Sequence, residues 1–130
     1  MPEVDPRRVE RFFAEYAAAL SDGDLDTLAR CYAYPSIVVT GDDSLVIDTP
    51  RQVVAAFRND APADDPLTAT ARVRSIESPA ENLAWVTVRW SYGVRGGAER
   101  SADAYRYLVR DAAGEVRICT VTPVPGEWIR

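Results

Sequence analysis

The C-terminal half of the chain contains four long segments of β-strand character, and this pattern restricts the fold more than any other feature. The segments cover residues 68–78, 83–92, 98–110 and 115–122. Short runs rich in turn-forming residues separate them, such as Pro79-Ala80-Glu81-Asn82 and Gly96-Gly97. Because a short turn can join only neighbouring antiparallel strands, the pattern predicts an antiparallel meander.

The N-terminal half has helical periodicity instead. Residues 6–21 predict an amphipathic helix that Asp5 caps and that carries Pro6 in its first turn. Apolar residues recur along it at the spacing of one helical face; they are Val9, Phe12, Phe13, Tyr16 and Leu20. Asp24 caps a second, shorter helix. We expect that helix to end at Tyr34-Pro35, because the residue before a proline avoids the helical conformation.

A short hairpin and a third helix complete the predicted order of elements. Residues 36–40 and 45–48 are predicted strands, and 61–66 a loop. Thr49-Pro50-Arg51-Gln52 has the capping-box pattern and predicts a helix from Pro50 to Arg58 or Asn59. We therefore predict the α+β class, with three N-terminal helices on a strongly curved, mostly antiparallel sheet in the order ααββαββββ. The length and uniform composition predict a single domain over residues 1–130.

The composition argues against several classes of function. The net charge of −5 disfavours binding to nucleic acid. The chain has no histidine, which excludes Ser-His-Asp and Cys-His catalysis and removes the commonest transition-metal ligand. No metal-ligand spacing, phosphate loop or nucleotide motif is present, so we expect neither a metal nor a cofactor. Cys31 and Cys119 lie in apolar stretches and predict buried thiols, although a disulfide stays open.

No apolar run is long enough to span a membrane, and residues 1–5 are acidic rather than apolar. We therefore expect a cytoplasmic protein with no membrane partner.

Alternation along two of the strands predicts aromatic rows on one face of the sheet. One row is Ala84, Val86, Val88, Trp90 and Tyr92, and the other is Asp103, Tyr105, Tyr107 and Val109. These rows fit a closed core and the wall of a pocket equally well. The opposite face carries Leu83, Trp85 and Leu108, which predict either solvent exposure or a partner surface.

The segment Phe12-Phe13-Ala14-Glu15-Tyr16-Ala17-Ala18-Ala19-Leu20-Ser21-Asp22-Gly23-Asp24-Leu25-Asp26, with the order of elements, resembles the nuclear transport factor 2-like superfamily. That group includes ketosteroid isomerases, SnoaL-like polyketide cyclases and scytalone dehydratase. The resemblance covers nearly the whole chain and implies a cystatin-like cone and a homodimer through the sheet face. It says little about activity, because this fold supports many functions.

The resemblance to ketosteroid isomerase implies two site residues. Tyr16 falls at the position of the oxyanion tyrosine, and Asp103, in Asp103-Ala104-Tyr105-Arg106-Tyr107, at that of the protonated acid. The position of the base falls on Thr40, which cannot abstract a proton from carbon. Asp42 and Asp43 follow two and three residues later and could act as a shifted base, although the spacing differs. Against these roles, Tyr16 could be a core residue and Asp103 could pair with an arginine such as Arg89.

Two functions remain open from the sequence. The first is a small-molecule-binding protein, or an enzyme of the SnoaL or ketosteroid isomerase type, whose ligand is mostly apolar and carries a carbonyl. The residues predicted for its pocket are Phe12, Tyr16, Val38, Thr40, Phe57, Trp90, Asp103, Tyr105 and Ile118. The second is a non-catalytic dimeric interaction module whose pocket is filled by its own side chains.

Overall fold

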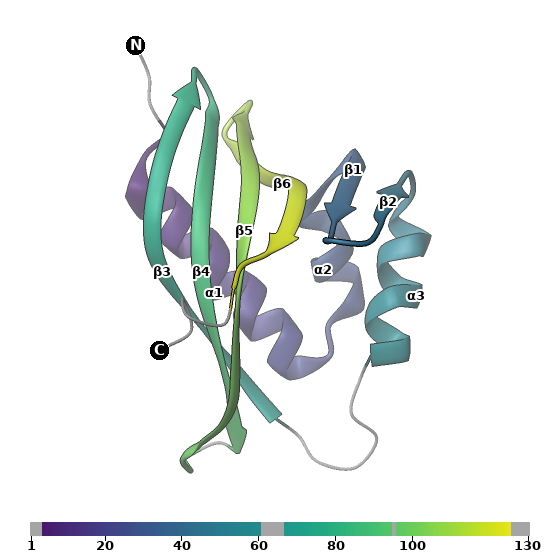
Figure 1. Cartoon of the computed structure of the whole chain (residues 1–130), viewed down its shortest axis with the longest axis vertical. Helices are drawn as coiled ribbons and strands as arrows, with labels where there is room; N and C mark the ends of the chain where they lie inside the picture. The colour runs from purple at the N-terminus through teal and green to yellow at the C-terminus, as the bar shows by residue number, and fades with distance from the viewer. Residues whose placement is uncertain (1–3, 61–66, 95, 126–130) are drawn as a thin grey trace.

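The computed structural model describes residues 4–60, 67–94 and 96–125, and it has helices on one side of a single curved sheet (Figure 1). The helices are α1 (Pro6–Asp22), α2 (Leu25–Arg30) and α3 (Pro50–Asp60). The strands are β1 (Tyr32–Val39), β2 (Ser44–Ile47), β3 (Leu67–Ala80), β4 (Leu83–Val94), β5 (Glu99–Ala112) and β6 (Glu115–Pro123). The α+β class is confirmed, while the predicted loop 61–66 lies outside the described residues.

The six strands form one sheet in the order β2-β1-β6-β5-β4-β3. β3 to β6 pair antiparallel with their neighbours in the chain, which confirms the predicted meander. In this register Trp90 lies opposite Asp103, and Val86 lies opposite Tyr107. β1 joins the meander through a parallel pairing with β6. α1 crosses the face of the long strands (Figure 1). α3 lies beside β2, at the opposite edge of the sheet from β3.

The first helix begins and ends where its capping residues predict. The Asp5 side chain accepts a hydrogen bond from the Arg7 N–H at 2.9 Å. Gly23 takes a left-handed φ of 68°, a conformation that glycine adopts without strain, and it closes the C-terminal end of the helix. Asp24 then caps α2 by accepting from the Thr27 N–H at 3.2 Å. Local sequence therefore determines both ends of α1 and the start of α2.

The second helix is shorter than predicted. It ends at Arg30, and β1 begins at Tyr32 rather than at Ser36. Tyr32 pairs with Ile118 of β6, and the Ile118 N–H donates to the Cys31 carbonyl at 2.8 Å. This pairing with a strand about 85 residues later in the chain outweighs the local preference, as tertiary contacts often do.

The core lies between the helices and the inner face of the sheet. The predicted alternation holds there, because Val86, Val88 and Trp90 of β4 are at most 1% exposed. On β5 the same inner face carries Tyr107 and Val109, which are also buried. Phe13 of α1 packs on Tyr107 with ring centroids 4.9 Å apart. No helix in the described part of the chain is long and apolar enough to cross a membrane.

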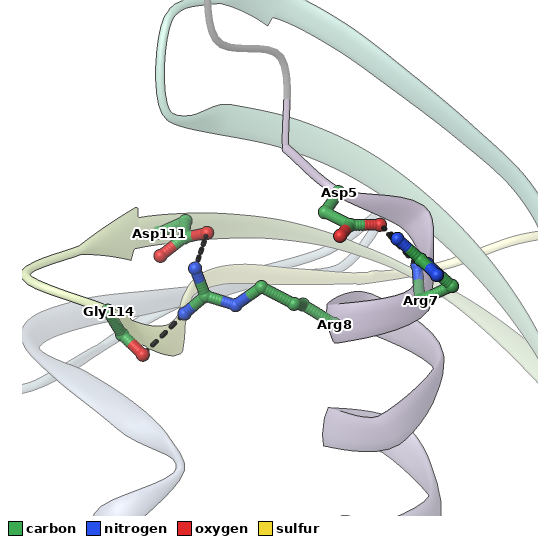
Figure 2. Close-up of polar contacts among 5 residues, drawn as sticks. All are labelled: Asp5, Arg7, Arg8, Asp111 and Gly114. Carbon is green, nitrogen blue, oxygen red and sulfur yellow. Dashed lines mark hydrogen bonds and ion pairs between the residues drawn. The ribbon is translucent and has the colours of Figure 1, made fainter.

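Two polar ties hold α1 against the sheet. Near its start, the Arg8 guanidinium pairs with Asp111 at 2.9 Å and donates to the Gly114 carbonyl in the β5–β6 turn (Figure 2). Near its end, the Ser21 hydroxyl accepts from the Ala69 N–H of β3 at 2.9 Å. These ties fix the helix at both ends, so the residues between them face the sheet in one register.

Candidate active site

A cavity of about 570 Å³, which we call the cone cavity, lies between the helices and the inner face of the sheet. Its wall is mostly apolar and aromatic. Among the described residues that line it, Asp103 is the only one with a charged side chain. The lining residues are Tyr16, Leu20, Gly23, Leu25, Leu28, Tyr32, Val38, Phe57, Ala69, Trp90, Tyr92, Asp103, Tyr105, Tyr107 and Val121.

Three buried tyrosines, which we call the phenol cluster, form one part of this wall: Tyr16, Tyr32 and Tyr107. The Tyr16 and Tyr32 hydroxyls are 2.7 Å apart and share a hydrogen bond. The Tyr107 hydroxyl accepts from the indole N–H of Trp90 at 2.9 Å. The Tyr16 ring also packs on Trp90, with centroids 5.6 Å apart. Each phenol ring is thus fixed by a hydrogen bond and by aromatic contacts.

The phenol cluster has more hydrogen-bond donors than it uses. A tyrosine hydroxyl donates one proton and also accepts. One of the Tyr16 and Tyr32 hydroxyls donates to the other, which leaves one O–H without a protein acceptor among the described residues. Tyr107 accepts from Trp90, and its own O–H likewise meets no acceptor in the described part of the chain. Because an unmade hydrogen bond is costly in a buried site, this end of the cavity is suited to a ligand oxygen.

All three phenols are held in their neutral, donating form. Burial raises the pKa of Tyr16 and of Tyr107 well above the ordinary value, and the nearby Tyr32 phenol raises both further. Burial also raises the pKa of Tyr32 itself, against the opposing effect of its hydrogen bond with Tyr16. Since burial disfavours a phenolate, the cluster stays a set of donors at neutral pH.

Asp103 and Tyr92 form a second polar feature, which we call the rim pair. The Tyr92 hydroxyl donates to Asp103 Oδ1 at 2.9 Å. Both residues are half-buried. Burial raises the pKa of Asp103, and the hydrogen bond from Tyr92 partly offsets this. Arg89, a candidate partner of Asp103 from the sequence, instead pairs with Glu99 at 2.9 Å.

The structure brings together most of the residues that the sequence suggested for a site. Tyr16 and Asp103 line the same cavity. Four other predicted pocket residues also line it: Val38, Phe57, Trp90 and Tyr105. The two proposed oxyanion donors do not bond each other, because Tyr16 is engaged with Tyr32 and Asp103 with Tyr92.

Three of the suggested residues do not line the cone cavity. Phe12 lines a separate groove along α1. Thr40 is exposed, and its hydroxyl accepts from the Asp43 N–H at 3.1 Å within the β1–β2 turn. Ile118 is fully buried in the core. The expectation that these three residues line the pocket is therefore corrected, since Phe12 faces the separate groove, Thr40 belongs to a turn and Ile118 to the packed core.

Sequence reasoning missed three polar members of the site. Tyr92 and Tyr107 already stood on the predicted inner rows, so the alternation pattern could have nominated them. Tyr32 was assigned to the end of the second helix, and only its pairing with β6 brings it into the wall.

The described residues contain no cluster of potential metal ligands and no disulfide. They contain no group of three or more His, Cys, Asp or Glu side chains that could hold a metal ion. Cys31 and Cys119 are both free, Cys31 buried and Cys119 half-buried. Burial raises the pKa of Cys31 to about 11, so its thiol stays protonated at neutral pH.

Comparison with solved structures shows the same fold at low sequence identity. An NTF-2 like protein of unknown function from Shewanella oneidensis superposes with a TM-score of 0.72 at 14% identity, over 89% of this chain and 95% of that one. A cystatin-like protein of unknown function from Nostoc punctiforme has a TM-score of 0.72 at 10% identity, over 97% and 96%. The beta subunit of benzoate 1,2-dioxygenase from Burkholderia mallei has a TM-score of 0.68 at 16% identity, over 100% and 97%.

No curated protein matches the chain in sequence. The model of one protein family does match, over residues 5–126, and that family is described as NTF2-like protein (DUF6841). The match runs from the residue that caps α1 to beyond the end of β6, and it agrees with the sheet and the helices described above. The chain belongs to the NTF2-like family DUF6841.

Proposed function

We propose that the protein binds a small, mostly apolar molecule in the cone cavity and holds it by a carbonyl oxygen at the phenol cluster. The observation that carries this proposal is the surplus of buried O–H donors at Tyr107 and at the Tyr16–Tyr32 pair. A carbonyl oxygen has two lone pairs and accepts two such bonds. The apolar wall supplies the remaining affinity.

The size and lining of the cavity support the same proposal. A volume of about 570 Å³ lies within the usual range for small-molecule sites, which are mostly apolar with a few polar groups that orient the ligand. The polar groups here are tyrosine hydroxyls and one carboxyl. A ligand with several charges would lose its hydration without gaining partners, so it is disfavoured.

Asp103 gives the bound molecule a direction. On the inner face of β5, Asp103 and Tyr107 are four residues apart, which corresponds to roughly 13 Å between their Cα atoms. A ligand whose carbonyl meets Tyr107 therefore directs its far end toward Asp103. If the protein is an enzyme of the SnoaL or ketosteroid isomerase type, proton exchange falls to Asp103, because Thr40 is exposed outside the cavity.

The decisive experiment compares ligands that differ only in the carbonyl. We would titrate the protein with 2-acetylnaphthalene and with 2-ethylnaphthalene, whose CH₂ replaces the C=O, and measure affinity by fluorescence. The ketone should bind about tenfold more tightly, as one to two hydrogen bonds predict. Tyr107→Phe should remove most of that preference.

The matched control is Tyr34→Phe. Tyr34 is a half-buried tyrosine whose hydroxyl donates to the Ala29 carbonyl at 2.5 Å, and it does not line the cavity. This variant should keep the preference for the ketone. If the two naphthalenes bound with equal affinity, or if Tyr107→Phe and Tyr34→Phe lost the preference for the ketone to the same extent, the phenol cluster would be removed from the proposal.

A second candidate function is a dimeric interaction module that uses the outer face of the sheet. Trp85 and Leu108 lie opposite each other there and are half-buried, and Arg106 stacks 5.2 Å from the Trp85 ring centroid. The Nε atom of Arg106 is buried without a hydrogen-bond partner in the described part of the chain. A second copy could cover this surface, and sedimentation of the wild type and of Trp85→Glu would test it. A monomeric wild type would end this candidate.

A further inference from the structure

A second hollow, which we call the arginine groove, runs along the first half of α1. It has a volume of about 470 Å³ and lies between α1, the end of α2, and the start of β6 with the turn before it. Four arginines line it, Arg8, Arg11, Arg30 and Arg117, although the chain as a whole carries a charge of −5. The groove shares no lining residue with the cone cavity.

Two of these arginines are neutralised by carboxylates and shape the groove. Arg8 reaches from α1 to the β5–β6 turn, where it pairs with Asp111 at 2.9 Å and donates to the Gly114 carbonyl (Figure 2). Arg117 pairs with Glu115 at 2.5 Å. These contacts use the charge of both side chains and fix the turn against the helix.

The other two arginines keep their charge available. Neither Arg11 nor Arg30 makes an ion pair with any residue in ranges 4–60, 67–94 and 96–125. Arg30 donates to the Thr27 hydroxyl at 3.0 Å, and Thr27 in turn donates to Asp24 at 2.6 Å. This contact orients the Arg30 guanidinium without occupying the whole of its donor edge, since a guanidinium carries five N–H donors.

The charges around the groove favour a ligand with a single negative charge. Asp111 and Glu115 neutralise Arg8 and Arg117. Glu15 and Asp24 are the other two nearby carboxylates, and Asp24 reaches Arg30 only through Thr27, so among the described residues neither Arg11 nor Arg30 has a directly bonded carboxylate. The floor is apolar, because Phe12 and Cys31 are less than a tenth exposed and Val116 is half-buried. Glu15 and Glu115 would repel a doubly charged phosphate more strongly than a singly charged group. A single carboxylate matches the paired N–H donors of one guanidinium.

We propose that the arginine groove binds a small monocarboxylate with an apolar body. The carboxylate lies between Arg11 and Arg30, and the apolar body lies against Phe12. The site is exposed to solvent, so its electrostatic part weakens as salt screens the charges.

Titrations of the full chain with phenylacetate, phenylacetamide and phenyl phosphate test this proposal. Phenylacetate should cause saturable shifts in the backbone amide NMR signals of Phe12, Cys31 and Val116, and phenylacetamide, its neutral counterpart, should not. Arg11→Gln and Arg30→Gln should each weaken phenylacetate binding about tenfold, the typical worth of a hydrogen bond to a charged group. Arg7→Gln is the matched control, because Arg7 is an exposed arginine of α1 outside the groove, and it should bind as the wild type does.

Several results would overturn the proposal. Among the ligands, these results are equal NMR shifts with phenylacetamide, tighter binding of phenyl phosphate than of phenylacetate, or no saturable shift with phenylacetate at low salt. Among the variants, they are unchanged phenylacetate affinity in Arg30→Gln, or an equal loss of affinity in Arg7→Gln. Shifts that appear at Tyr92 and Asp103 instead would place phenylacetate in the cone cavity and would also exclude the groove. Since the two hollows share no residue, a failure here leaves the carbonyl test in the cone cavity unaffected.

Discussion

The phenol cluster and the rim pair lie on the wall of one cavity, yet they offer opposite chemistry. Tyr16, Tyr32 and Tyr107 are at most 6% exposed, neutral and rich in donors. Asp103 and Tyr92 are half-buried, and the carboxylate accepts the Tyr92 hydroxyl. The difference suggests a ligand with two ends, of which the buried end carries an acceptor and the other end meets a carboxyl group. The following predictions test whether the two regions differ as described.

The largest expected effect is on stability at the buried end. Trp90 is 1% exposed, holds Tyr107 through its indole N–H and packs on Tyr16. Trp90→Ala should lower the free energy of unfolding by about 3–5 kcal/mol, as large core truncations do. Trp85→Ala is the control, because Trp85 is half-buried on the opposite face of the same strand. Urea unfolding should show the smaller loss there, and equal losses would contradict the assignment of faces.

The second effect concerns the bond between Tyr16 and Tyr32. Tyr16→Phe and Tyr32→Phe should each destabilise the protein by about 1 kcal/mol, the usual net worth of a hydrogen bond. In the double variant the losses should not add, because either single change already breaks the bond at 2.7 Å. A double-mutant cycle measured by urea unfolding gives the coupling energy. A coupling of zero would show that the two hydroxyls act independently.

A smaller effect, dependent on pH, is expected at the rim pair. Burial raises the pKa of Asp103 in the folded protein. The folded state therefore holds this proton more tightly than the unfolded chain, and ionisation of Asp103 costs stability as the pH rises through its folded pKa. At pH values below the pKa of Asp103 in the unfolded chain, the carboxyl is protonated in both states and this cost is absent.

Asp103→Asn should remove that cost. The stability of the variant relative to the wild type should rise from about pH 4 toward pH 7, measured by urea unfolding at a series of pH values. Ala55→Gln, at an exposed position of α3 that carries no ionisable group in either form, provides the control and should run parallel to the wild type. If the stability of Asp103→Asn also changed with pH as that of the wild type does, burial of this carboxyl would have no energetic consequence.

The smallest effect is expected at position 40. Thr40 is exposed in the β1–β2 turn and does not line the cone cavity. Thr40→Asp should therefore leave the affinity for 2-acetylnaphthalene unchanged, as fluorescence titration would show. A change in affinity would place this residue near the ligand and would reopen the case for a base at this position.

The fold could be predicted from the sequence largely because its signals are local. Capping by Asp5, the spacing of Phe12, Phe13 and Tyr16, and the strand-turn alternation of the C-terminal half each act within a few residues. The position of Tyr32 could not be predicted in this way. It depends on a parallel pairing with Ile118, far along the chain, and such a pairing has no local pattern.

The sequence predicted which residues form the site better than it predicted the hydrogen bonds between them. The inner rows of β4 and β5 follow from alternation, so Trp90, Asp103 and Tyr105 could be nominated. The bond between Tyr92 and Asp103 depends on the register of two strands, and that register is determined by the turn between them and by packing. Thr40 was assigned by counting along the chain, and a count cannot show that the residue sits in an exposed turn.

The central claim is that spare O–H groups of the phenol cluster donate to a bound carbonyl. The most direct measurement is the infrared C=O stretch of 2-acetylnaphthalene, labelled with ¹³C at the carbonyl, when it is bound to the protein. We predict a lower frequency than in an apolar solvent, and a return toward the apolar value in Tyr107→Phe. A bound carbonyl that absorbs as it does in an apolar solvent, in wild type and variant alike, would contradict the account.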